Sequence, residues 1–425
     1  MKSPRPPRVL FATAGSHGDI HPFIALALAL KARGAATVLT TNPYFQAEIE
    51  RAGIDFFPAS KPIDVAQFIR DNPWMHNPLV AGKRLFERVV LPMLEDGQRR
   101  ADDLIRDFKP DIALMHPLCV GGAAVSEKHH VPWASVALAP VIWMSAHEPN
   151  VTVPIGPGGM HPPLWWWRFL RHHGRKIMRR VLDRPLNRNR AALGLAPLED
   201  HWDNVTRGGV LSLGLWSPAF RPPLPDDPAA ARITGFPWYD QSEQDWPGRD
   251  ALERFIAADA PPIVFSLGTA TVHDPRNFYD LAAHAAHRIG RRAVLLIGRS
   301  GTPPRNLPPG VICAAYAPFS WIMPRCAAAV HHGGIGSTAQ GLRSGRPTVI
   351  VPFSHDQFDN ARRCEVLGTS VTLKASRMTR ARFERALSEA LDAPRARAAQ
   401  ALAPNVAHDG ADAAAQEIIA SVTAR

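Results

Sequence analysis

Short apolar segments alternate with helical stretches along this chain of 425 residues, and the alternation starts afresh in its second half. The first half opens with RVLFATA (8–14), an expected helix from Pro22 to Arg33 and TVLTTN (37–42), and the second opens with PIVFSLGT (262–269). Strands that alternate with helices form parallel sheets, because parallel neighbours need a long crossover connection. The pattern therefore predicts an α/β fold of two doubly wound domains. The other expected strands cover 111–118, 133–140, 209–216, 292–299, 311–318, 327–334 and 348–354.

A proline-rich segment divides the two halves. RPPLPDDPAAAR (221–232) has the composition of an interdomain linker. We therefore expect an N-terminal domain over 1–220, a C-terminal domain over 233–408 and a lone C-terminal helix over 409–425. Ligands of doubly wound sheets bind beyond the carboxyl ends of the strands, which predicts a binding cleft between the two domains.

Composition excludes several classes of protein. The sequence has no uncharged apolar run of 18 residues, so we expect no transmembrane helix. The basic N-terminus leads into a short apolar run, which we interpret as the first strand rather than as a signal peptide. The four cysteines have no CxxC spacing, which indicates free thiols in a reducing cytoplasm and not a disulfide framework or a zinc site.

The net charge of +11 is unevenly distributed. Nine Lys or Arg and one Asp lie between Arg168 and Arg190, so this segment alone carries +8. A chain that is basic throughout would suggest nucleic acid, whereas a basic patch within one helix favours a local anionic surface such as a membrane. We therefore expect no nucleic-acid partner.

The segment 165–182 has two interpretations. Apolar residues such as Trp167, Met178 and Val181 recur at helical spacing, and Pro185 is expected to end the helix. One interpretation is a structural helix with a solvated basic face. The other is a helix that docks on an anionic membrane, which would place a cytoplasmic protein at the inner membrane face. The basic residues expected on another face of this helix are Arg168, Arg171, Arg175 and Arg179.

The segment HHGGIGST (331–338) joins an expected strand to a helix through glycines. Small residues let a ligand approach the backbone, and the helix N-terminus offers unpaired N–H groups and a positive dipole, so the loop predicts a phosphate site. Neighbouring strand residues point to opposite faces, so His331 and His332 cannot easily share a metal ion. We assign His332 to the ligand and His331 to packing. A tight turn with an incidental histidine is the alternative.

A polar cluster follows the next expected strand and contains His355, Asp356, Gln357 and Asn360. Adjacent carboxylate and amide groups form paired hydrogen bonds with vicinal hydroxyls, as sugar recognition requires. An exposed polar turn is the alternative. Upstream, AYAPF (315–319) places an aromatic side chain at a strand end, where a nucleobase could stack.

Together these motifs resemble the donor-binding signature of the family 1 glycosyltransferases, which have the GT-B fold of two Rossmann-like domains facing across a cleft. The residues that carry the likeness are YAPF, HHGGIGS and GLRSGRPTVIVPFSHDQFDNARR. GSHGDIHPFIALALALKARG (15–34) resembles the opening of the branch that contains glycopeptide and sterol glucosyltransferases. Within that branch the sequence is most similar to the rhamnosyltransferases of rhamnolipid biosynthesis, including SAHEP (145–149) and ITGFPWYD (233–240). The likeness extends over nearly the whole chain and is weakest around 60–110.

The resemblance implies a nucleotide diphosphate sugar as donor and a role for each matching residue. Tyr316 and the backbone near Phe319 would hold the base, and Asp356 and Gln357 would bind the sugar hydroxyls. Gln340 stands where many plant members have a glutamate that grips both ribose hydroxyls, which favours a deoxyribose donor such as a dTDP-sugar. The diphosphate would lie against Thr269, His332, Gly334, Gly336, Ser337 and Thr338.

The resemblance also implies a catalytic base after the first strand. Plant members have His in a GH-x-x-P motif, whereas this chain has Asp19 in G-D-I-H-P. A carboxylate there would face the acceptor and take the hydroxyl proton during attack, contributing ~10²–10⁴-fold to the rate. A helix cap is the alternative role of Asp19, and His17 and His21 are rival bases.

Metal ions and cofactors are not expected. The chain has no D-x-D pair to hold a cation on the diphosphate, so the helix dipole and His332 would have to neutralise the leaving group. No G-x-G-x-x-G follows the first strand, which removes the main support for a dehydrogenase.

The sequence thus predicts a metal-independent, inverting glycosyltransferase. We favour transfer of rhamnose from dTDP-L-rhamnose to a hydrophobic acceptor, a 3-hydroxyacyl lipid. Glucosylation of a sterol, carotenoid or polyketide is the main alternative. A nucleotide-sugar epimerase and a non-catalytic membrane-surface protein that binds nucleotide sugars are the rivals from other classes.

Overall fold

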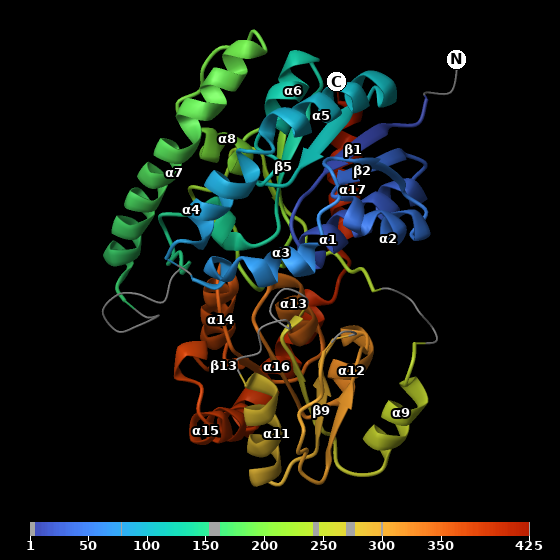
Figure 1. The fold of residues 1–425 in the computed structure, drawn as a ribbon, viewed down its shortest axis with the longest axis vertical. Helices are drawn as coiled ribbons and strands as arrows, with labels where there is room; N and C mark the ends of the chain where they lie inside the picture. The colour runs from blue at the N-terminus through green and yellow to red at the C-terminus, as the bar shows by residue number, and fades with distance from the viewer. Residues whose placement is uncertain are drawn as a thin grey trace.

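The computed structural model describes residues 5–77, 79–152, 162–240, 246–268, 277–298 and 301–424. It has two halves, one above the other in Figure 1, and each half is a parallel sheet flanked by helices. The prediction of an α/β fold with two doubly wound domains is therefore confirmed.

The N-terminal sheet has seven parallel strands within the described residues, in the order β3–β2–β1–β4–β5–β6–β7. The chain passes from β1 to β2 on one side and later returns to add β4 on the other, so β1 lies at a topological switch point. The ends of β1 and β4 are neighbours, since Ala12 pairs with Met115. The strands are β1 (Arg8–Ala12), β2 (Ala36–Thr41), β3 (Asp55–Pro58), β4 (Ile112–Met115), β5 (Trp133–Ala137), β6 (Leu211–Gly214) and β7 (Ala231–Ile233).

The C-terminal sheet has six parallel strands within the described residues, in the order β10–β9–β8–β11–β12–β13. Its switch point lies between β8 and β11, and His331 at the end of β11 pairs with Ser266 of β8 and Ile350 of β12. The strands are β8 (Ile263–Ser266), β9 (Ala293–Leu296), β10 (Val311–Ala314), β11 (Ala328–His331), β12 (Thr348–Ile350) and β13 (Ser370–Thr372).

Helices pack their apolar faces on each sheet and bury two large cores. In the N-terminal half they are α1 (His17–Ala32), α2 (Gln46–Arg51), α3 (Val65–Asp71), α4 (Ala81–Leu85), α5 (Leu94–Phe108), α6 (Gly122–Lys128), α7 (Leu164–Ala192) and α8 (His201–Arg207). The later helices are α9 (Arg249–Ala257), α11 (Phe278–Arg288), α12 (Phe319–Ile322), α13 (Ile335–Arg343), α14 (Gln357–Val366), α15 (Arg380–Ala390), α16 (Ala393–Val406) and α17 (Gly410–Thr423).

Helix α1 begins at His17, earlier than expected, because a capping box closes its first turn. The Asp19 carboxylate accepts hydrogen bonds from the backbone N–H and the hydroxyl of Ser16, at 2.7 and 3.1 Å. The box satisfies polar groups that the start of a helix leaves unpaired. Pro22, expected at the first helical position, therefore lies inside the helix.

The prediction that Pro185 ends the basic helix is wrong, because α7 continues past it to Ala192. Leu182 and Leu186, on either side of the proline, are buried in a cluster with Val205. This packing offsets the backbone hydrogen bond that proline cannot donate.

Segments on both sides of the C-terminal half belong to the N-terminal domain. β7 pairs with β6, so the N-terminal sheet extends through the last residues of the segment 221–232 that was expected as a linker. Helix α17 then crosses back from the C-terminal half and packs along α1. Its Ala411, Ala414 and Ile418 are buried in the N-terminal core, so the expected lone helix is part of that domain.

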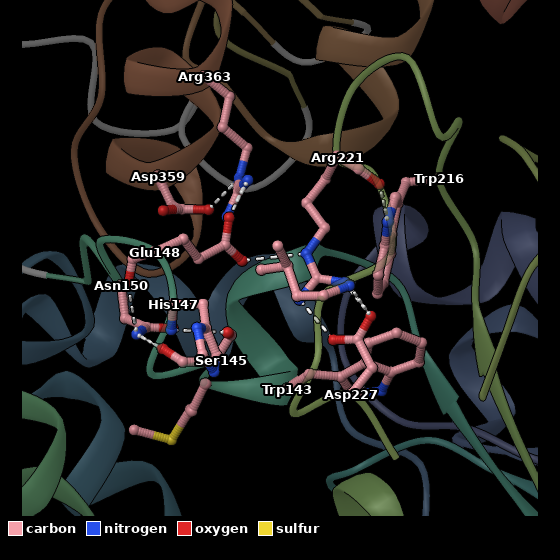
Figure 2. A network of polar contacts seen from close by, with 12 residues as sticks. Trp143, Ser145, His147, Glu148, Asn150, Trp216, Arg221, Asp227, Asp359 and Arg363 are labelled. Carbon is pink, nitrogen blue, oxygen red and sulfur yellow. Dashed lines mark hydrogen bonds and ion pairs between the residues drawn. The ribbon is translucent and has the colours of Figure 1, made fainter. Parts of the chain in front are cut away.

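A buried ion network joins the two domains, and Figure 2 shows Glu148 between two arginines. Glu148 Oε1 accepts a hydrogen bond from Arg221 Nε (3.1 Å), and its Oε2 accepts one from Arg363 Nη1 (2.7 Å). Glu148 lies between β5 and α7, Arg221 in the proline-rich segment and Arg363 on α14. One carboxylate therefore connects three separate parts of the chain.

Two further carboxylates complete this network. Asp227 accepts from both terminal nitrogens of Arg221 (2.5 and 2.6 Å), and Asp359 accepts from Arg363 Nε (2.6 Å). Both arginines are buried. Burial alone would raise the pKa of Glu148, but the charges of Arg363 and Arg221 and their hydrogen bonds lower it below the ordinary glutamate value.

We expect Glu148→Gln to destabilise the protein by ~3–5 kcal/mol, because two buried arginines lose their shared counter-charge. Chemical denaturation beside the unmodified chain measures this. Glu87→Gln is the matched control, since Glu87 forms an exposed pair with Lys83 and should matter by less than ~1 kcal/mol.

The effect should depend on pH. Because folding lowers the pKa of Glu148, its contribution is present above the unfolded-state pKa of ~4.3 and is lost as the pH falls through the folded value. Equal stability of Glu148→Gln and Glu87→Gln at neutral pH would contradict the proposed role of the ion network.

Candidate functional site

Candidate side chains gather where the carboxyl ends of central strands from the two domains approach each other. β1 and β4 contribute from the N-terminal half, and β11 and β12 from the C-terminal half. Ile335, the first residue of α13, packs against the N-terminal core, so the glycine loop of one domain touches the other domain.

Asp19 is both part of a helix capping box and a neighbour of a buried histidine. Its Oδ2 belongs to the capping box with Ser16, while its Oδ1 lies 3.6 Å from Nε2 of His116. The N-cap of α1 is Ser16, and Asp19 closes the capping box from the third helical position rather than being the N-cap itself. The capping box uses one carboxylate oxygen of Asp19, and the other oxygen faces His116.

His116 is a further candidate residue beside Asp19, and no motif in the sequence marks it. It directly follows β4, and its Nδ1 accepts a hydrogen bond from the N–H of Leu118 (3.3 Å). The ring proton is therefore on Nε2, toward Asp19. Burial lowers the pKa of His116, although the charge of Asp19 opposes this, so the imidazole is neutral at neutral pH.

His17 and His21 have a different partner. The Nε2 atoms of both imidazoles pair with the carboxylate of Glu48 on α2. Burial lowers the pKa of His17, the neighbouring His21 lowers it further, and Glu48 opposes both effects. The two rival bases are thus directed toward α2, whereas Asp19 is directed toward β4.

Two glycines, Gly268 and Gly334, make room for the ring of His332. A Cβ on Gly268 would collide with its Cε1, and a Cβ on Gly334 would lie 2.5 Å from its Nε2. Gly333 has φ of +91°, and a Cβ there would meet Ile350 at 2.7 Å. The glycines of this loop therefore hold His332 against the start of α13, as well as leaving the backbone accessible.

Both adjacent histidines are buried and neutral. Burial lowers the pKa of His331 to about 3 and that of His332 to about 4. With this pKa the His332 imidazole is neutral at neutral pH and can donate one hydrogen bond. His331 Nδ1 accepts from the N–H of Gly333 (3.1 Å), and the Nδ1 of His332 has no hydrogen-bond partner in the described part of the chain.

The first turn of α13 contains the other predicted diphosphate contacts. Gly334 is the N-cap, Gly336 is exposed and Ser337 is partly exposed. Thr338 is buried, and its hydroxyl donates to the carbonyl of Gly333 (3.3 Å), so this side chain supports the loop from within. Thr269 lies outside the described residues.

The polar cluster after β12 is internally bonded. Asn360 Nδ2 donates to Oδ2 of Asp356 (2.8 Å) and to the carbonyl of Gly333 (2.9 Å), which links the cluster to the glycine loop. Gln357 Oε1 accepts from the backbone N–H groups of Phe353 and Ser354, so it closes the turn at the end of the strand. Asp356 is the member whose carboxyl is held beside the loop.

Asp356 is electrostatically coupled to the other domain. Burial raises its pKa to about 7, the hydrogen bond from Asn360 opposes this rise, and the negative charge of Asp19 adds to it. The candidate carboxyls of the two domains therefore lie close enough to influence each other.

Aromatic residues lie at the end of β10, where a nucleobase was expected. Tyr316 and Phe319 are partly buried in a cluster with Trp246 and Trp321. The ring centroids of Trp246 and Tyr316 are 6.4 Å apart in an edge-to-face arrangement. The sequence motif identified two of these four rings.

Gln340 contacts a carboxylate from the segment between the domains. Its Nε2 donates to Oδ1 of Asp240 at 3.3 Å. Position 340 lacks the glutamate of many plant members, but the carboxylate of Asp240, 100 positions earlier, lies beside Gln340. Only the folded chain brings the two together.

The four cysteines are unpaired in the structure. Burial raises the pKa of the thiols of Cys119, Cys326 and Cys364 to about 12. Buried thiols that stay protonated are packing residues rather than nucleophiles.

Two family models match the chain, one in each domain. Residues 9–135 match the glycosyltransferase family 28 N-terminal domain. Residues 291–424 match the C-terminal domain of erythromycin biosynthesis protein CIII-like proteins.

Curated relatives fall in two groups. The O-mycaminosyltylonolide 6-deoxyallosyltransferase of Streptomyces fradiae is 31% identical over 376 residues, which cover 85% of this chain and 84% of that protein. The sterol 3-beta-glucosyltransferase of Emericella nidulans is 28% identical over 390 residues, covering 88% of this chain. The chain spans only 27% of the length of that fungal protein.

Solved structures share the fold over the whole chain. A calicheamicin glycosyltransferase superposes with a TM-score of 0.73 at 20% identity and covers 99% of both chains. A Streptomyces glycosyltransferase complexed with thymidine diphosphate has a TM-score of 0.65 at 20% identity, covering 97% of this chain and 99% of that one.

Two doubly wound domains, with the glycine loop of the C-terminal domain packed against the N-terminal core, form the architecture of the GT-B glycosyltransferases. With its relative in Streptomyces fradiae, the chain belongs to the family 1 type of nucleotide-sugar glycosyltransferases.

We expect the free energy of unfolding of Asp356→Asn to increase, relative to that of the unmodified chain, as the pH rises. Folding raises the pKa of Asp356 to about 7, so the protonated acid contributes stability below the unfolded value of ~3.9 and this contribution is lost as the pH rises through 7. Asn mimics the neutral acid, so the difference should grow by up to ~1.4 kcal/mol per pH unit between pH 5 and 7.

Denaturation at several pH values measures this difference. Asp55→Asn, at an exposed position on the edge strand β3, is the control and should give a flat difference. A flat profile for Asp356→Asn would mean that the buried carboxyl stays ionised.

Proposed function

We propose that this protein transfers a sugar from a nucleotide diphosphate sugar to a hydroxyl of a hydrophobic acceptor, with inversion and without a metal ion on the diphosphate. The observation that carries the proposal is the contact between the domains at the glycine loop, where Ile335 packs against the N-terminal core and Asn360 joins the loop to Asp356. The charge of Asp19 also raises the pKa of Asp356. An acceptor held by one domain and a donor held by the other meet between these two carboxyls.

The donor diphosphate binds at the N-terminus of α13. Backbone N–H groups and the helix dipole stabilise the leaving group as it takes up negative charge, and the glycines of the loop allow close approach. The unpartnered Nδ1 of buried His332 supports this assignment, because a neutral imidazole can donate one hydrogen bond to a phosphate oxygen.

The sugar lies beside Asp356, with its hydroxyls hydrogen-bonded to that carboxyl. Gln357 and Asn360 act mainly by holding the turn in shape, since their side chains are bonded to backbone and to Asp356. Thr269, Tyr316, Phe319 and Gln340 keep the donor roles that the resemblance implies.

Asp19 acts as the base. As the oxygen of the acceptor hydroxyl attacks the anomeric carbon, the hydroxyl proton passes to the Asp19 carboxylate. The bond from the anomeric carbon to the diphosphate oxygen breaks at the same time. Ser16 orients the carboxylate through two hydrogen bonds, and Nε2 of His116 lies 3.6 Å from its other oxygen. The arrangement is a carboxylate held in a helix cap beside a neutral histidine, whose Nδ1 accepts a hydrogen bond from the N–H of Leu118.

For the donor we favour dTDP-L-rhamnose, and for the acceptor a 3-hydroxyacyl lipid. The similarity of the GDIHPF, SAHEP and ITGFPWYD segments to rhamnolipid rhamnosyltransferases supports this choice. The thymidine diphosphate complex of the Streptomyces neighbour supports a dTDP-sugar. The sterol and macrolide transferases among the relatives support the alternative of a polycyclic or polyketide acceptor.

Asp19→Asn should lower turnover by ~10²-fold or more with donor affinity nearly unchanged. The Asn carbonyl still accepts from the Ser16 backbone, so the helix cap survives and only the basic oxygen is lost. Ser16→Ala is the control and should keep turnover within about tenfold of the unmodified enzyme, because the backbone hydrogen bond to Asp19 remains.

The assay follows release of dTDP from dTDP-rhamnose with and without a hydroxyacyl acceptor. Acceptor-dependent release supports a transferase. Isomerised donor without release would instead indicate an epimerase, and donor binding without either product a non-catalytic protein. Near-normal turnover of Asp19→Asn would place the base elsewhere.

Membrane docking through α7 is the second part of the proposal. The described helices include none with the length and apolar character of a membrane span. α7 lies along the outer side of the N-terminal half in Figure 1. Trp165, Phe169 and Ile177 on this helix are 63, 49 and 45% exposed.

Two arginines of α7 bind other parts of the fold and serve as anchors of the helix, whereas other cations of α7 are exposed. Arg171 donates to the carbonyl of Met144, and Arg175 pairs with Asp200 and Asp203, so these two hold the helix in place rather than forming an outward row. The helix also borders an open groove of about 700 Å³ whose lining is Arg171, His172, Arg175, Lys176, Arg179, Arg180, Asp183 and Asp200. Exposed aromatic residues beside a basic groove complement an anionic lipid surface.

We expect vesicles with anionic lipid to co-sediment with the protein in a salt-sensitive manner. Each cation near the surface contributes ~1 kcal/mol, and this fades as the Debye length falls to ~3 Å near 1 M salt. Replacing exposed Lys176, Arg180 and Arg184 by Gln should abolish sedimentation without disturbing the anchors.

The matched control removes the same charge from the other domain, at exposed Arg377, Arg380 and Arg385, and should sediment like the unmodified chain. Equal sedimentation of both triple variants would leave α7 as a structural helix with a solvated basic face.

A further inference from the structure

Two histidines and a glutamate on the N-terminal domain converge on one point. His17 and His21 lie one turn apart on α1, and Glu48 faces them from α2. Their donor atoms all lie within 4.8 Å of one another, and within the described residues this is the one such group of three His, Cys, Asp or Glu side chains. His21 Nε2 is 2.8 Å from Glu48 Oε1, and His17 Nε2 is 3.5 Å from Oε2.

These distances fit a tetrahedral metal ion. Zinc binds imidazole nitrogen and carboxylate oxygen at about 2.0–2.2 Å, so neighbouring donors around it lie roughly 3.3–3.5 Å apart. The three donors need only small adjustments of side-chain torsion to reach that spacing. Residues four apart on a helix present their side chains on one face, which is why His17 and His21 can share an ion although His331 and His332 cannot.

The three side chains are held in place by their surroundings. The ring of His17 meets Phe45 edge to face at 5.0 Å between centroids, and the ring of His21 meets Tyr239 at 5.1 Å. The Glu48 side chain is 11% exposed, and those of the two histidines are about one-third exposed. The ligands are thus pre-oriented, yet an ion can reach them from solvent.

We propose that His17, His21 and Glu48 form a zinc-type site with three protein ligands and one open position. The site lies on the first two turns of α1, outside the glycine loop that binds the diphosphate. A metal ion there ties these turns to α2. The alternative is that Glu48 serves only as a hydrogen-bond partner of the two imidazoles.

Calorimetric titration of the full-length, tag-free protein with Zn²⁺, after treatment with EDTA and dialysis, tests the proposal. We expect one equivalent to bind to the unmodified chain. His21→Ala and Glu48→Gln should each weaken binding by at least ~100-fold, since loss of a ligand exceeds the 10–100-fold typical of an outer partner.

The control is the double variant His172→Ala, His173→Ala, which removes an exposed histidine pair on α7 and should bind Zn²⁺ like the unmodified chain. Circular dichroism checks that each variant is folded. Visible absorption of bound Co²⁺ gives a second measurement on the unmodified protein, because a tetrahedral site with nitrogen and oxygen ligands produces intense bands. Absence of stoichiometric binding, or binding that survives loss of His21 and disappears with His172 and His173, would overturn the proposal.

Discussion

One buried carboxylate joins the two domains through directional hydrogen bonds. Glu148 accepts hydrogen bonds from Arg221, in the proline-rich segment between β6 and β7, and from Arg363 on α14. Apolar packing between the domains is not directional, whereas hydrogen bonds between ions depend on the angle and distance of both partners. Buried ion pairs are costly to desolvate, so we interpret this network as a device for orientation more than for net stability.

Much of the fold could be predicted from the sequence, because each strand of a buried parallel sheet is a short apolar run and needs no knowledge of its neighbours. The glycine loop (331–338) and the polar cluster after β12 could be predicted for the same reason, because the residues of each motif are adjacent in the chain. The sequence did not reveal strand order. His116 lies next to Asp19 only because β4 pairs with β1, and no spacing along the chain indicates that contact.

Other differences arise where tertiary packing overrides a local rule. Pro185 does not end α7, because buried leucines on both sides hold the helix together. Arg171 and Arg175 look like part of a solvated row in the sequence, but acidic and carbonyl partners from elsewhere in the fold bind them. Asp240 reaches Gln340 from 100 residues away. Each case depends on partners that are distant in sequence, which a periodic pattern cannot contain.

The return of α17 to the N-terminal domain makes the C-terminal domain an insertion in terms of connectivity. Ala411, Ala414 and Ile418 line the core that Phe11 and Phe23 belong to, and they are translated after the entire second sheet. On the ribosome, the first domain to emerge is therefore the last to be completed. Until residues 410–424 are made, the apolar side of α1 that they cover remains open to solvent or to chaperones. The chain passes between the domains twice, after β7 and before α17, and these two connections limit how far the domains can move apart.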